Sequence, residues 1–189
     1  MSTLKRFAAQ AAALLAFTAL SLVAHATTTA LSNPGQWYEF DVADGLSQSQ
    51  GTEWIDLDGA PLSFTFTIAA PVQLRVVDAG YAGDTFNISL NGASYTTSAV
   101  APGVYPNAPG LTDFDAAWAD ASFSRGTWLL SAPGTYTLTG SLAQSVTDAN
   151  GPLNATLGAV MLAPVPEPTT WALLIAGLAV LGFAARRRT

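Results

Sequence analysis

Short runs of alternating apolar and polar residues constrain the fold of this chain most strongly. In residues 62–68, Leu62, Phe64, Phe66 and Ile68 alternate with serine and threonine. Because successive side chains of a strand point to opposite faces, such a run has one face for a core and one for solvent. Similar runs occupy 36–42, 72–77, 85–90, 94–98, 128–130, 134–142 and 153–162, with turn-forming residues between them. The pattern predicts an all-β fold, a single antiparallel β-sandwich of jelly-roll type.

Local signals refine this prediction at three places. Asn91-Gly92 predicts a tight hairpin between the runs 85–90 and 94–98. Residues 111–123 carry Phe114, Ala117, Trp118 and Ala121 at helical spacing. They form either a short helix or a loop anchored by Trp118. Three prolines and two glycines predict a long loop over 101–110.

The N-terminus has the layout of a secretory signal peptide. Lys5 and Arg6 precede an apolar stretch over 7–23, and Ala24-His25-Ala26 is a small-x-small cleavage site. We therefore expect residues 1–26 to be a signal helix that signal peptidase removes after Ala26. An uncleaved anchor is the alternative.

The C-terminus has a Pro-Glu-Pro tripeptide at Pro166, Glu167 and Pro168, then an uncharged apolar run, then Arg186, Arg187 and Arg188. As a helix, the run 171–185 would span roughly 22 Å, which is short of a hydrocarbon core of about 30 Å. With its flanking residues, 170–185 is predicted to be a transmembrane helix. The arginine cluster places the C-terminus in the cytoplasm and the preceding domain outside the cell. A core helix ending the domain is the alternative.

Charge is distributed unevenly between the middle and the ends. Of 7 basic residues, only Arg75 and Arg125 lie between the two terminal segments, against 12 of the 13 acidic residues. The middle segment therefore has a formal charge of −10. Such a surface repels nucleic acid and anionic lipid, so we expect no nucleic-acid partner.

Several catalytic residue types are missing from the middle segment. The chain has no cysteine, its one histidine is His25, and its one lysine is Lys5. A thiolate, a histidine base, a Ser-His-Asp triad and a Schiff base are therefore excluded after signal cleavage. Only a carboxylate-pair mechanism, as in glycoside hydrolysis, stays open. We expect a protein that is not an enzyme.

The C-terminal segment resembles a PEP-CTERM sorting signal. The resemblance rests on Pro166-Glu167-Pro168, the apolar run and the arginine cluster, and it covers about the last 25 residues. It implies that an exosortase recognises the tripeptide and cuts near it, in a Gram-negative host that makes exopolysaccharide. Three segments follow: a signal peptide at 1–26, a β-sandwich ectodomain at 27–163 and the sorting signal at 164–189. Membrane anchoring before processing, then a place at the cell surface or in the extracellular matrix, is expected.

The middle segment is similar to CUB domains. Val77-Asp78-Ala79, Gly83-Asp84-Thr85-Phe86 and Leu90-Asn91-Gly92 carry the resemblance, with 119–126 and 132–136 as its second half. It implies calcium binding by Asp78, Asp84 and Asp120, because hard cations favour clustered oxygen ligands. The chain departs from the family in lacking cysteines and in having Asp78 where the first acid is commonly glutamate. The alternative is that these acids cap turns and solubilise the surface.

Aromatic residues near turns suggest a role in sugar binding. Trp54, Tyr81 and Tyr105 lie beside turn-forming residues. An exposed ring there would bury apolar area against a sugar face.

Three functions remain open. The first is a non-enzymatic surface protein associated with exopolysaccharide or the envelope. The second is a carbohydrate-binding module, with or without calcium. The third, a carboxylate-pair glycoside hydrolase, ranks last.

Overall fold

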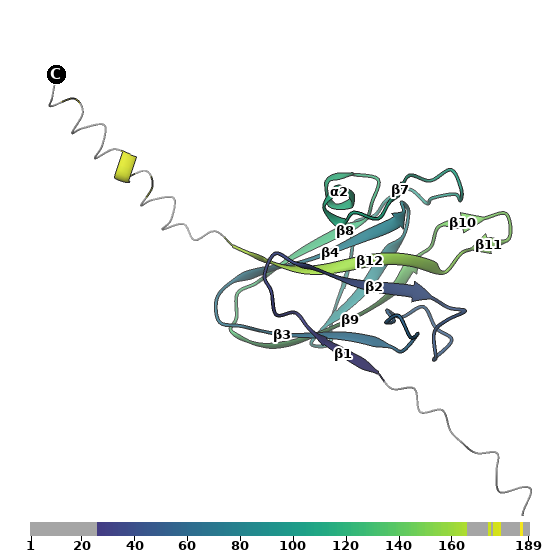
Figure 1. Ribbon diagram of the computed structural model, residues 1–189, viewed down its shortest axis with the longest axis horizontal. Coiled ribbons are helices and arrows are strands. Elements are labelled where there is room, and N and C mark those ends of the chain that lie inside the picture. Colours follow the sequence, from purple (N-terminus) through teal and green to yellow (C-terminus); the bar gives the residue numbers. More distant parts are fainter. Residues whose placement is uncertain (1–25, 166–173, 175, 179–185, 187–189) are drawn as a thin grey trace, which may run out of the picture.

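Two β-sheets face each other and enclose one main hydrophobic core (Figure 1). The computed structural model describes residues 26–165, 174, 176–178 and 186. The predicted all-β sandwich is confirmed, since all but one of the sheet pairings are antiparallel. The signal-peptide residues before Ala26 lie outside the described residues.

The first sheet has the strand order β1-β3-β9-β5-β6. Its strands are β1 (Thr27–Ala30), β3 (Leu62–Ile68), β5 (Thr85–Leu90), β6 (Ala93–Thr96) and β9 (Gly134–Gln144). β1 runs parallel to β3. β1 was not expected from the sequence, because Thr27–Ala30 shows no apolar alternation. Its backbone instead extends the edge of the sheet.

The second sheet has β12 at its centre, between β2 and β4. Its strands are β2 (Trp37–Ala43), β4 (Val72–Tyr81), β8 (Arg125–Leu130) and β12 (Ala155–Pro164), with β7 (Gly110–Leu111) at the end of β4. A small hairpin of β10 (Thr147–Asp148) and β11 (Gly151–Pro152) projects from one end of the sandwich (Figure 1). β4 pairs with β12 on one side and with β8 on the other.

The core between the sheets is centred on aromatic rings. Trp54 is completely buried and stacks on Phe40 with ring centroids 3.9 Å apart. Phe86 meets both rings edge-on. The indole fits because Gly140 faces it: a Cβ there would lie 2.2 Å from the ring. A side chain at position 140 would therefore collide with the largest group in the core.

A short helix covers the outer face of the second sheet. This helix, α2 (Phe114–Ala119), begins after Asp113, whose side chain accepts the backbone N–H of Ala116. Such an N-cap contributes about 1 kcal/mol. Ala117 packs into a second, smaller cluster with Val77 and Phe123. Of the two alternatives for this segment, the helix is confirmed.

The predicted hairpin at Asn91-Gly92 is also confirmed. β5 and β6 pair through Leu90 and Ala93, and both turn residues have positive φ, 48° and 83°. Asn91 and Gly92 adopt this left-handed conformation more readily than other residues, which is why the dipeptide predicted the turn.

Candidate functional site

The loop end of the sandwich brings two buried carboxyl groups together. Asp78 lies in β4 and Asp84 precedes β5, and both are buried. The Thr156 hydroxyl donates to Oδ1 of Asp78 at 3.4 Å. The Val146 backbone N–H donates to Oδ1 of Asp84 at 2.7 Å. Within the described part of the chain, Oδ2 of Asp78 has no hydrogen bond of standard geometry, although the backbone N–H groups of Gly83 and Asp84 lower the pKa of this carboxyl.

Burial changes the protonation of this pair. Desolvation, reinforced by the nearby charge of Asp84, raises the pKa of Asp78 to about 9. Desolvation also raises the pKa of Asp84 to about 6, although hydrogen bonds from Thr156 and Val146 oppose the shift. At neutral pH the pair therefore carries at least one proton, because two adjacent buried carboxylates repel each other.

Asp120 does not join the pair. It ends α2, and its Oδ1 accepts the Ser122 backbone N–H at 2.8 Å. This hydrogen bond lowers its pKa. Asp120 lies with α2 on the outer face of the second sheet. Asp78 lies two residues after the core-facing Val76 in β4, so its side chain is on the inner face of that sheet. The expected set of three carboxylates is thus not assembled.

Without Asp120, the side-chain oxygens of Asp78, Asp84 and Thr156 do not form a calcium site. Calcium takes six to eight oxygen ligands, usually including several ionised carboxylates. Within the described part of the chain, no three acidic side chains are grouped so as to hold a metal ion. Asp78 and Asp84 with Thr156 offer too few oxygen ligands for this ion. We derive no calcium-dependent step from this site.

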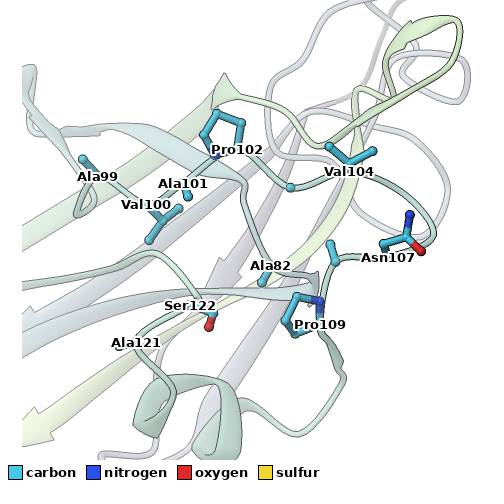
Figure 2. Close-up of a pocket in the computed structure, with 12 residues that line it drawn as sticks. Ala82, Ala99, Val100, Ala101, Pro102, Val104, Asn107, Pro109, Ala121 and Ser122 are labelled. Carbon is cyan, nitrogen blue, oxygen red and sulfur yellow. The ribbon is translucent and has the colours of Figure 1, made fainter.

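A cleft of about 660 Å³ is lined by Ala82 and by the 99–104 segment, but neither Asp78 nor Asp84 lines it. Figure 2 shows the segment from Ala99 to Val104 on one side, with Ala121 and Ser122 facing it. The loop is held in place because Thr147 donates its N–H to Gly103 and accepts that of Tyr105. The lining consists of small and largely apolar side chains, so the cleft offers shape but little charge.

Of the three aromatic residues expected to contact sugar, two come together and one does not. Tyr81 and Tyr105 are 38% and 45% exposed and meet edge to face, with ring centroids 5.1 Å apart. They adjoin the cleft residues Ala82 and Val104 in sequence. Trp54 was wrongly expected to be exposed: it is buried in the core, and its neighbouring turn residues misled the prediction.

The terminal processing residues lie mostly outside the described part of the chain. This applies to Ala24, to Pro166, Glu167 and Pro168, and to Arg187 and Arg188; Ala26 and Arg186 are described. None of the described residues forms a helix long and apolar enough to cross a membrane. Most of the expected span 170–185 belongs to the undescribed part.

The structure also shows a polar surface that was not expected from the sequence. The outer face of the first sheet carries hydroxyl and amide groups across neighbouring strands. The sequence does show serine and threonine between the apolar residues of each strand. The strand pairing was needed to show that these positions share one face.

Comparison with known proteins identifies the C-terminal segment. Residues 164–188 match the PEP-CTERM protein-sorting motif. No curated protein matches the chain. Among solved structures, the chain is similar to the pre-peptidase C-terminal domain of collagenase from Bacillus anthracis. That similarity has 11% identity and a TM-score of 0.34, and covers 73% of this chain and 94% of that domain.

The matched segment begins where the folded domain ends. β12 ends at Pro164, which is also the first residue of the motif. This motif indicates export, sorting to the cell surface and processing by an exosortase. The protein is therefore a β-sandwich with a PEP-CTERM protein-sorting motif directly attached to its central strand.

Proposed function

We propose that this protein is a non-enzymatic component of the cell envelope or exopolysaccharide matrix, displayed there after signal peptidase and exosortase have removed its two ends. The PEP-CTERM motif at residues 164–188 carries this proposal. Before processing, the C-terminal segment holds the chain at the membrane with the sandwich outside. Cleavage near Pro166–Pro168 then leaves the sandwich as the mature protein.

The arrangement of the last strand supports processing without unfolding. β12 pairs with β2 as far as Met161 and with β4 as far as Pro164, its last residue. Only Val165 separates Pro164 from the tripeptide. Cleavage at the tripeptide would therefore leave every strand of the sandwich in place.

The buried carboxyl pair supports the non-enzymatic part of the proposal. A carboxylate-pair hydrolase needs both groups to face its substrate. Asp78 and Asp84 have exposed fractions of 0% and 1%, so neither can reach a sugar in this conformation.

The sorting function is tested by replacing Pro166, Glu167 and Pro168 together with alanine. We expect the variant to remain uncut and membrane-retained, with lower electrophoretic mobility than the processed wild type. The matched control replaces Thr169 and Thr170 with alanine and should be processed normally. Identical mobility and fractionation of the triple variant and the wild type would contradict the proposal.

A second candidate function is carbohydrate binding at the loop end. The exposed Tyr81–Tyr105 pair beside the cleft favours it, since rings at such a site can stack on sugar faces. Tyr105→Ala should weaken binding to the exopolysaccharide of the host about fivefold or more, because it removes about 1 kcal/mol or more of ring contact. The control Leu129→Ala removes an exposed apolar side chain from β8. Equal retention of wild type and Tyr105→Ala in a pull-down would exclude this candidate site.

A further inference from the structure

The five strands of the first sheet contain no charged residue. Their sequences, TTTA, LSFTFTI, TFNISL, ASYT and GTYTLTGSLAQ, hold no Asp, Glu, Lys or Arg. In the second sheet, by contrast, Glu39, Asp41, Arg75 and Arg125 lie within the strands. The strands of the first sheet are therefore uncharged, although the domain as a whole is acidic.

The polar residues of the first sheet share its outer face. Leu62, Phe64, Phe66 and Ile68 of β3 are buried, so the serine and threonine positions between them point outward. The registers align rows across neighbouring strands: Thr96–Asn87–Ser141, Ser94–Ser89–Thr139, Thr137–Thr65 and Thr135–Thr67. Thr28 adds to the edge beside Ser63. We call this surface the hydroxyl face.

Part of the hydroxyl face is hollow and has free hydrogen-bonding groups. A depression of about 410 Å³ lies over β6, β5 and β9. Its lining includes Ser89, Ser94, Thr139 and Ser141. Elsewhere on the face, hydroxyls pair with each other, as Thr67 does with Thr135 at 2.9 Å. The hydroxyls of the four lining residues make no hydrogen bond within the described part of the chain.

One acidic residue flanks the face without entering it. Glu53 pairs through its backbone with Ser141 at a corner of the sheet. Its carboxylate accepts hydrogen bonds from the hydroxyls of Ser47 and Ser49. The rest of the face is uncharged.

The chemistry of the hydroxyl face selects one class of ligand. Solvent-facing sheet surfaces ordinarily carry charges, which keep them soluble and prevent association. Hydroxyl and amide groups both donate and accept hydrogen bonds, as sugar hydroxyls do. Side chains within one row lie about 4.8 Å apart, because this is the distance between neighbouring strands, and such a repeat suits an extended polymer with repeated hydroxyls. An acidic polymer is disfavoured because the domain as a whole is strongly negative.

We propose that the hydroxyl face binds a neutral polysaccharide chain laid across β6, β5 and β9. This inference rests on the proposed matrix location, because it assumes that the sandwich meets polysaccharide there. It is separate from the tyrosine pair, which joins the end of β4 to the 101–110 loop.

The test is affinity electrophoresis of the full chain, solubilised in mild detergent, in gels containing a neutral polymer (hydroxyethylcellulose or dextran) or acidic alginate. We expect retardation in a neutral gel and none in alginate. Thr139→Glu, which places a charge within the depression, should lower the affinity about tenfold or more, since the carboxylate must lose water against an uncharged ligand. Thr139→Val, which removes only the hydroxyl, should cause a smaller loss.

The matched control is Thr127→Glu, which adds the same charge at an exposed position of β8 in the other sheet and should bind as the wild type does. Unchanged retardation of Thr139→Glu, retardation in alginate, or no retardation in either neutral gel would overturn the proposal. So would a change of oligomeric state on Thr139→Glu without loss of retardation, which would make the face a contact between copies. The experiment does not require C-terminal processing, so its failure is distinguishable from failure of the sorting proposal.

Discussion

At the scale of single residues, burial decides what each predicted site residue can do. Asp78 and Asp84 were expected to be calcium ligands together with Asp120, but the described structure groups no third acidic side chain with them. The spacing of the two carboxyls in the sequence suited a shared calcium ion. It did not show that the α2 segment keeps Asp120 away or that Thr156 and Val146 occupy the nearest donor positions. These contacts link residues 60 or more positions apart, and only the fold defines them.

The same pair makes stability depend on pH. Both pKa values are raised in the folded state, so the folded protein binds protons that the unfolded chain releases above about pH 4. This contribution is complete below pH 4 and is lost as the pH rises through about 6 and then about 9. We expect the melting temperature to fall between pH 5 and pH 9, by about 2–4 °C per kcal/mol lost.

Asp78→Asn tests this origin, because it removes the ionisable group and keeps the side-chain shape. Its melting temperature should fall less between pH 5 and pH 9 than that of the wild type, as measured by differential scanning calorimetry. Asp58→Asn, at an exposed turn, is the control and should keep the wild-type slope. A wild-type slope in Asp78→Asn would show that other groups cause the pH dependence.

At the scale of elements, strands with strict alternation were predictable and the segments between them were not. The bounds of β3 and β5 agree with the predicted runs, because their apolar residues all face one core. The hairpin followed from two residues with positive φ. β1 was missed because its contribution is backbone pairing with β3, which leaves no pattern in the side chains.

The loops were predictable as loops, but their shapes were not. Residues 101–110 were predicted as a loop from their prolines and glycines, and most of them line the cleft of about 660 Å³. Their shape depends on close backbone approach: a Cβ on Gly103 would lie 2.1 Å from the carbonyl oxygen of Ala82. Such a contact between distant segments cannot be read from composition.

At the scale of the whole molecule, charge and architecture divide the protein into surfaces with different roles. The second sheet and the loops carry the charged residues of the strands and turns, while the first sheet presents an uncharged hydroxyl face. The last central strand leads directly into the sorting motif. The sandwich is thus a stable body that cleavage can release without removing any strand.

The position of the mature C-terminus tests this account most directly. Intact-mass spectrometry of the protein recovered from the cell surface should give a C-terminus close to Pro166–Pro168, with the apolar run and the arginine cluster absent. The sandwich from β1 to β12 should remain whole. Recovery of a surface protein that still ends at Thr189 would contradict the account.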